Sequence, residues 1–223
     1  MFLFDWTFLI LIPALIFSLI AQGLVNRTWK KTSKIPSDSG ITASDFADIV
    51  ASKEGLFIKV VPVTGVLTDH YNPINKTLAL SEEVFHSESI GALSICAHEL
   101  GHAIQHKTGY IPLKVRNSIV PVVNFGSSAA LPLFFVGFIF AWKTLMDIGI
   151  IFFAGALLFH LVTLPVELDA SKRALLILKN YIPEEKVSLA RSMLFAAALT
   201  YIAAIAVALS QLIRLLILRE ARE

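Results

Sequence analysis

The residues best suited to chemistry stand together in the segment His98-Glu99-Leu100-Gly101-His102. Histidines four positions apart on a helix lie on the same side and one turn apart, so both imidazoles can bind one metal ion. This H-E-x-x-H spacing is typical of zinc metallopeptidases. Glu99 points about 100° away from His98, toward a water on the metal, and is the natural general base. The segment therefore predicts a zinc site with His98 and His102 as ligands and Glu99 as the catalytic residue.

The helix that carries this motif is predicted to begin at Ser89 and to end near Gly109. Its apolar residues recur at spacings of three and four, as in an amphipathic helix: Ile90, Leu93, Ala97, Leu100 and Ile104. His98 and His102 project from the side opposite this stripe. The alternative is a pair of unrelated surface histidines, and the sequence context favours the metal site over it.

Two histidines do not complete a catalytic zinc site, which usually has three protein ligands and a water. His106 is a poor third ligand, because it lies about 12 Å from His98 along a continuous helix. Glu167 is the best candidate, since it follows directly after a long apolar stretch. The alternative for Glu167 is a carboxylate at the membrane interface. We expect a single zinc ion bound by His98, His102 and Glu167.

A peptidase also needs a hydrogen-bond donor for the oxyanion that forms during attack. His70, Tyr71 and Tyr110 are candidates by residue type alone, and the segment 69–73 is equally consistent with an ordered turn. The segment 77–80 is consistent either with an edge strand that pairs with an extended substrate or with an inner, fully paired strand.

The residues before the motif predict a small α+β unit around it. Thr42 or Ser44 can cap a helix that ends at Gly55. Two extended runs follow, at 56–63 and 77–80, and the stretch 68–75 between them is rich in turn-forming residues.

The composition excludes a soluble protein. Apolar residues make up 56% of the chain, charged residues only 16%, and the mean hydropathy is +0.71, whereas soluble domains contain about 25% charged residues. Four stretches without acidic or basic residues are each long enough to cross a bilayer: 6–25, 117–142, 148–166 and 192–213. The chain is therefore predicted to be a mainly α integral membrane protein with about four transmembrane helices and a small cytoplasmic zincin-like α+β unit.

Charge around the first stretch predicts the topology. The only charged residue before it is Asp5. The stretch is followed by four basic residues, Arg27, Lys30, Lys31 and Lys34. The positive-inside rule then places the N-terminus outside and the motif in the cytoplasm. The basic cluster needs no nucleic-acid partner, and a specific lipid site is the less favoured alternative. A signal anchor is favoured over a signal peptide cleaved at Ala21-Gln22-Gly23, because the apolar run is long and its start is acidic.

The predicted organisation is a multi-pass protein of the inner (plasma) membrane whose active site faces the cytoplasm. Transmembrane helices are expected at 1–25, 117–142, 148–166 and 192–213. The cytoplasmic zincin-like unit is expected at 26–116. A cytoplasmic segment with the third metal ligand is expected at 167–191, and a C-terminal tail at 214–223. The tail would lie outside, although Arg214, Arg219 and Arg222 fit that side poorly.

Three isolated residues are weaker candidates for function. Cys96 is the only cysteine, so no disulfide can form within the chain, and a small buried side chain is expected there. Asn124 and His160 lie inside apolar stretches. They indicate either a polar seam leading to the metal or a simple hydrogen bond between helices.

Five segments together resemble the bacterial YugP-type neutral zinc metallopeptidases, over nearly the whole chain: 67–73, 78–82, 97–105, 122–127 and 167–171. The chain is more distantly similar to the HtpX and CAAX prenyl membrane proteases. That resemblance implies His98, His102 and Glu167 as zinc ligands and Glu99 as the base. The distant relatives have an aspartate four residues after the glutamate. Here Ser171 holds that position and Asp169 lies at two, so the residues that support the ligands stay open.

The predicted function is that of a membrane zinc endopeptidase, in which Glu99 deprotonates a zinc-bound water that attacks a peptide bond. Peptides or membrane proteins are the expected substrates, and a membrane-protein adaptor or a second copy of the chain are conceivable partners. The alternative is a zinc-binding membrane interaction or scaffold protein without turnover.

Overall fold

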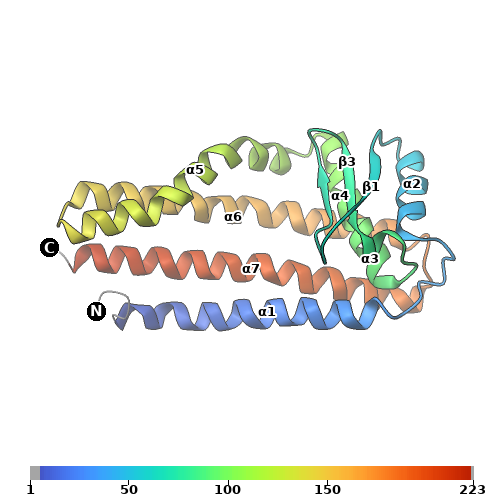
Figure 1. The fold of residues 1–223 in the computed structure, drawn as a ribbon, viewed down its shortest axis with the longest axis horizontal. Helices are drawn as coiled ribbons and strands as arrows, with labels where there is room; N and C mark the ends of the chain where they lie inside the picture. The colour runs from blue at the N-terminus through green and yellow to red at the C-terminus, as the bar shows by residue number, and fades with distance from the viewer. Residues whose placement is uncertain (1–5, 222–223) are drawn as a thin grey trace. The chain divides into compact units, whose positions relative to one another are not determined.

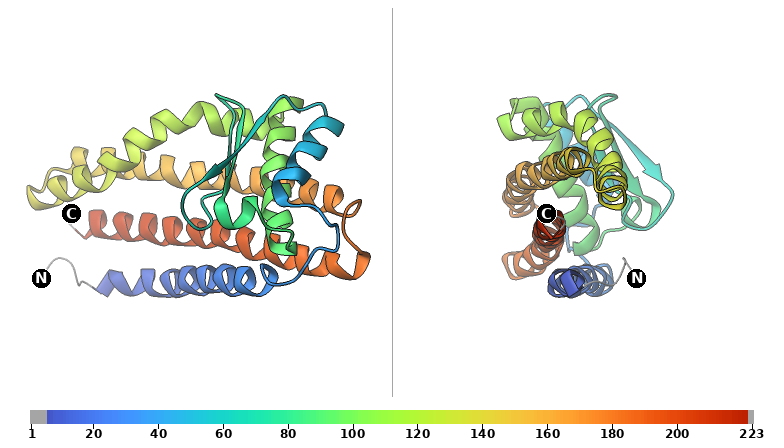
Figure 2. Two further views of the ribbon diagram at one scale, coloured as in Figure 1. Left: turned by 45° about the vertical axis from the view of Figure 1, so that its right-hand side comes forward. Right: turned by 90° about the vertical axis from the view of Figure 1, so that its left-hand side faces the viewer.

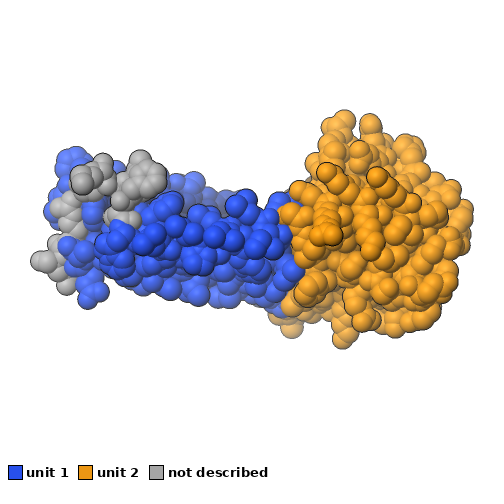
Figure 3. Space-filling view, turned by 90° about the horizontal axis from the view of Figure 1, so that it is seen from below, with its two compact units in different colours: residues 1–22, 114–165, 199–223 blue, residues 23–113, 166–198 orange. Residues whose placement is uncertain are grey.

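The computed structural model describes residues 6–221, which are mainly helical with one small mixed sheet (Figure 1). The described chain divides into two compact units, coloured separately in Figure 3. Unit 1 comprises 1–22, 114–165 and 199–223, and unit 2 comprises 23–113 and 166–198. Asp5, Arg222 and Glu223 fall outside the described residues.

Four long helices contribute to unit 1: α1 (Leu11–Thr32), α5 (Ile111–Ile139), α6 (Lys143–Leu178) and α7 (Glu184–Glu220). A short 3-10 helix, η1 (Trp6–Ile10), precedes α1. All four are long and apolar enough to cross a membrane, which confirms the predicted number of candidate spans. Each helix also extends beyond its uncharged stretch, so the basic residues Lys30 and Lys31 lie in the last turn of α1.

Two basic residues near the C-terminus, Arg214 and Arg219, make polar contacts within unit 1. Arg219 donates from Nε to Asp147 Oδ1 at 3.0 Å, and Arg214 donates from Nε to Thr7 Oγ1 at 3.2 Å. The contact with Asp147 brings the end of α7 beside the start of α6.

Neither the polar seam nor the hydrogen bond between helices considered for Asn124 and His160 is found among the residues that the structure describes. Asn124 is exposed on α5, and no described hydrogen bond joins it to His160. The ring of His160 packs instead against the neighbouring Phe159, with centroids 6.0 Å apart.

Unit 2 contains a three-stranded sheet in the order β1-β3-β2. Its strands are β1 (Lys59–Val63), β2 (His70–Asn72) and β3 (Thr77–Ser81). β3 is parallel to β1 and antiparallel to β2. The edge-strand alternative for 77–80 is therefore wrong, because β3 is paired on both sides. Within the turn-rich stretch 68–75, residues 70–72 form the edge strand β2.

Three helices pack around this sheet, and their ends follow local sequence signals. α2 (Ala43–Lys53) is capped by Thr42, whose side chain accepts from Asp45 N. α3 (Glu82–Phe85) is a single turn. α4 (Ile90–Thr108) begins after Ser89, which caps it, and ends at Gly109, whose φ of 65° is left-handed. Both the 89–109 helix and its predicted ends are confirmed.

The apolar side of α4 forms the core of unit 2. Leu93, Ala97 and Leu100 are fully buried, as the apolar stripe predicts. Cys96 is also fully buried, and its Sγ lies 3.2 Å from the backbone oxygen of Ala43. The lone thiol is therefore part of the packing between α4 and α2.

The segment 167–191 is largely helical. α6 continues to Leu178, and α7 begins at Glu184, directly after Pro183. Glu184 and Glu185 in the first turn of α7 favour this start, because acidic side chains stabilise a helix N-terminus. The two views in Figure 2 show α4 lying beside the sheet and next to this end of α6. The residues after 166 therefore reach the motif from a continuous helix.

Candidate metal centre

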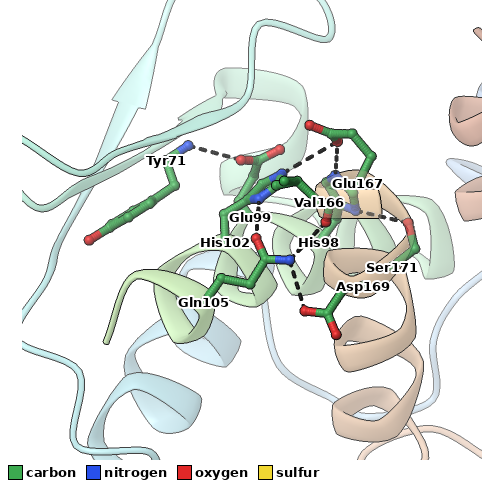
Figure 4. Close-up of polar contacts among 9 residues, drawn as sticks. All are labelled: Tyr71, His98, Glu99, His102, Gln105, Val166, Glu167, Asp169 and Ser171. Carbon is green, nitrogen blue, oxygen red and sulfur yellow. Dashed lines mark hydrogen bonds and ion pairs between the residues drawn. The ribbon is translucent and has the colours of Figure 1, made fainter. Parts of the chain in front are cut away.

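Unit 2 brings His98, His102 and Glu167 together (Figure 4). Glu167 Oε2 lies 3.2 Å from His98 Nε2 and 3.5 Å from His102 Nε2. One ligand atom from each residue lies within 4.8 Å of the others. The side chains are 15%, 12% and 3% exposed for His98, His102 and Glu167, so water reaches the cluster mainly at the histidines.

The geometry of the cluster fits a zinc ion. Zinc binds imidazole nitrogen and carboxylate oxygen at about 2.0 to 2.2 Å, so neighbouring donors around a tetrahedral ion lie about 3.3 Å apart. The two nitrogen-to-oxygen distances lie close to that value, and all three donor atoms lie within 4.8 Å of one another. Two imidazoles and one carboxylate also form a donor set that suits zinc and leaves a fourth position for water.

Each histidine is oriented by a second contact through its other ring nitrogen. His98 Nδ1 lies 3.2 Å from Ser171 Oγ, and His102 Nδ1 lies 3.0 Å from Gln105 Oε1. Such contacts fix the ring orientation and direct Nε2 toward the metal position. Ser171 therefore contacts a histidine from the position where the distant relatives have aspartate.

Gln105 connects the histidines to Asp169. Its side chain is fully buried, and Nε2 donates to Val166 O at 2.8 Å and to Asp169 Oδ2 at 2.9 Å. Asp169 also accepts from Arg173 Nε at 2.6 Å. Asp169 therefore supports His102 through Gln105 and does not face the cluster itself.

Sequence reasoning missed Gln105 and Arg173, which belong to the hydrogen-bond network beside the candidate ligands. Gln105 lies three positions after His102, hence on the same side of α4. A glutamine on the same side of the helix as His102 could have indicated a contact with that histidine. Arg173 follows Asp169 by four positions on α6, a spacing that favours an ion pair.

Glu99 lies beside the cluster and is held by the sheet. Tyr71 in β2 donates its backbone N–H to Glu99 Oε2 at 2.9 Å (Figure 4). Burial raises the pKa of the Glu99 carboxyl, although the nearby histidines oppose the shift. A raised pKa makes Glu99 a better proton acceptor than an exposed glutamate.

The pKa of His102 reflects the same environment. Burial on its own would lower that pKa, but the hydrogen bond to Glu167 and the charge of Glu99 outweigh burial and raise it. Two carboxylates thus surround the imidazoles, and a cation is the natural complement to their charge.

The three candidate oxyanion donors have different surroundings. His70 is exposed, and its Nδ1 lies 2.9 Å from Thr68 O. Tyr71 Oη lies 2.9 Å from His106 Nδ1. The Tyr110 ring faces the guanidinium of Arg173 at 5.8 Å. Only Tyr71 contacts a residue of the motif, and it does so through its backbone.

Asp69 anchors the strand that carries Tyr71. Its Oδ1 accepts from Ser81 N at 2.7 Å and from Ser81 Oγ at 3.1 Å. Burial raises the pKa of the Asp69 carboxyl, while the hydrogen bonds from Ser81 oppose the shift. The segment 69–73 is therefore an ordered structural element that positions the backbone of Tyr71.

Close packing between α4 and α6 depends on Gly101. A Cβ atom at this position would lie only 2.6 Å from Ala170 O and 3.1 Å from Ala170 Cα. Backbone atoms cannot yield as the end of a flexible side chain can. The absence of a side chain at 101 thus allows α4 to approach the turn of α6 that carries Glu167.

We expect Gly101→Ala to destabilise unit 2 by about 1 to 3 kcal/mol, because the added methyl group would force the two helices apart. The measurement is the thermal unfolding midpoint of the purified chain. Gly23→Ala is the matched control, since nothing lies within 4 Å of a Cβ there. An unfolding midpoint lowered more by Gly23→Ala than by Gly101→Ala would contradict this account.

Comparisons with known proteins agree with the resemblance seen in the sequence. A family model described as "Putative neutral zinc metallopeptidase" matches residues 7–220. The chain is also 42% identical over 206 residues to "Putative membrane protease YugP" of Bacillus subtilis (strain 168). That alignment covers 91% of this chain and 92% of the relative. No solved structure gives a match.

Proposed function

We propose that this chain, which belongs to the family of putative neutral zinc metallopeptidases, is a membrane-embedded zinc endopeptidase. His98, His102 and Glu167 would bind the zinc ion, and Glu99 would act as the general base. The observation that carries the proposal is the meeting of two imidazoles and one carboxylate at distances suited to zinc, next to a glutamate held by Tyr71 N–H.

The protein groups have defined tasks in this reaction. When bound, zinc supplies a polarised water and draws electron density from the substrate carbonyl. Glu99 would accept a proton from the water whose oxygen bonds to the substrate carbonyl carbon, and would deliver that proton to the amine nitrogen as the carbon–nitrogen bond breaks. Ser171 and Gln105 hold the two imidazoles in place during both transfers.

A membrane location follows from the four candidate spans and from the similarity to a membrane protease. Substrates that reach a site near a bilayer include the loops, tails and unfolded segments of membrane proteins. The edge strand beside α4 is β2, so we expect an extended substrate to approach that strand.

The direct test is peptide hydrolysis by the purified full-length chain before zinc chelation, after chelation and after zinc is restored. The proposal expects hydrolysis to disappear with the metal and to return with it. The rival function is a zinc-binding interaction protein without turnover. That rival gains support if the chain binds zinc at His98, His102 and Glu167 yet cleaves no peptide in a broad mixture.

The proposed topology can be tested by adding one cysteine at a time. Cys96 can stay in place, because it is fully buried and shielded from the reagent. Thr144 and Ser52 are exposed in unit 1 and unit 2. A cysteine at Thr144 should react with an impermeant thiol reagent in intact cells. A cysteine at Ser52 should react only after the cells are permeabilised. The opposite labelling pattern would place the active site outside.

A further inference from the structure

A pocket of about 350 Å³ lies in unit 2, on the same side of α4 as Glu99. Its apolar lining residues are Leu56, Phe57, Ile58 and Ala103, and Tyr71 lines it as well. Ala103 and His106 line it from α4, at four and seven positions after Glu99. Residues with this spacing share one face of a helix.

Tyr71 connects the pocket to the general base. Its backbone N–H donates to Glu99 Oε2, while its side-chain Oη contacts His106 Nδ1 at the pocket. Glu99 and His106 are about 10 Å apart along the helix axis. An extended peptide advances about 3.3 Å per residue, so the pocket lies roughly three residues from the bond next to Glu99.

The polar part of the pocket carries the ammonium groups of Lys76 and Lys107. Lys76, Lys107 and His106 line it, and the lining includes no carboxylate. Lys107 Nζ donates to the backbone oxygen of Glu54, which holds the ammonium group at the pocket. An ammonium group has three N–H donors, so Lys107 retains donors for a bound anion.

We propose that this pocket binds an acidic side chain of the peptide substrate, about three residues from the cleaved bond. The inference rests on the proposed function and specifies its substrate class. The methylene groups of a glutamate match the apolar lining, and its carboxylate complements the ammonium groups of Lys76 and Lys107. Lys76 and Lys107 are exposed, so an ion pair with each contributes up to about 1 kcal/mol, and the two together favour the charged ligand over its neutral isostere.

The test measures peptide binding by the zinc-loaded full-length Glu99→Gln protein in detergent. The probes are two mixtures of end-blocked fluorescent decapeptides, with either glutamate or glutamine at the centre and neutral residues elsewhere. We expect the glutamate mixture to bind about 10-fold more tightly. Lys76→Met and Lys107→Met should each reduce that preference. Lys59→Met is the matched control and should preserve it, because Lys59 is exposed on β1 and does not line the pocket.

Two outcomes would overturn the proposal. One is equal binding of the two mixtures, whether strong or weak. The other is equally tight, Lys107-dependent binding of glutamine peptides with a free C-terminus, which would assign the pocket to a chain end. Hydrolysis of the same mixtures by the zinc-loaded wild-type protein reports separately on the proposed function, so the two failures are distinguishable.

Discussion

Replacing Glu99 with glutamine is expected to lower peptide hydrolysis by about 10² to 10⁴ while the protein retains its zinc. Glutamine has nearly the same shape, and its amide oxygen can still accept the hydrogen bond from Tyr71 N. It cannot accept a proton from the attacking water, however. His98, His102 and Glu167 are untouched, so metal binding should persist.

The measurement combines zinc content with hydrolysis rates for the wild-type and variant proteins. Glu83→Gln is the matched control, because Glu83 is an exposed glutamate of α3 in the same unit. It should leave both quantities unchanged. Undiminished cleavage by a zinc-loaded Glu99→Gln protein would show that another group takes the proton.

Local signals made α4 predictable from the sequence. The cap at Ser89, the left-handed end at Gly109 and the apolar stripe act over only a few residues. The spacing of His98 and His102 is likewise a property of a single helix. These features do not depend on how distant parts of the chain pack, so they could be predicted without any tertiary information.

Sheet order depends on contacts between distant residues and could not be predicted in the same way. The edge strand β2 contains only three residues, and it lies in a stretch of turn-forming residues. Its place is fixed by pairing with β3 and by the hydrogen bonds from Ser81 to Asp69. Neither the pairing with β3 nor these hydrogen bonds can be recognised from the residues of β2 alone.

The contacts that support the candidate metal ligands could not be predicted from the sequence either. Glu167 is 69 positions from His98, and its selection depended on the end of an apolar stretch and on the family resemblance. The contacts of Ser171 and Gln105 depend on the register between α4 and α6. That register is set by the close approach of Gly101 to Ala170, which only the folded unit reveals.

Glu167→Ala should lose both bound zinc and hydrolysis, because it removes the carboxylate that lies against both imidazoles. The two histidines would remain as a pair of ligands, which is too few for a stable catalytic zinc site. Metal analysis of the purified variant is the measurement, and it does not depend on knowing a substrate.

Asp169→Ala is the matched comparison, since Asp169 is an acidic residue only two positions away on the same helix. Its carboxylate accepts from Gln105 and Arg173 and reaches His102 only through Gln105. Loss of such a supporting contact typically weakens metal affinity or activity by about 10- to 100-fold. The variant should therefore keep most of its zinc when zinc is supplied in excess. A zinc-replete Glu167→Ala protein beside a zinc-free Asp169→Ala protein would reverse the assignment of the third ligand.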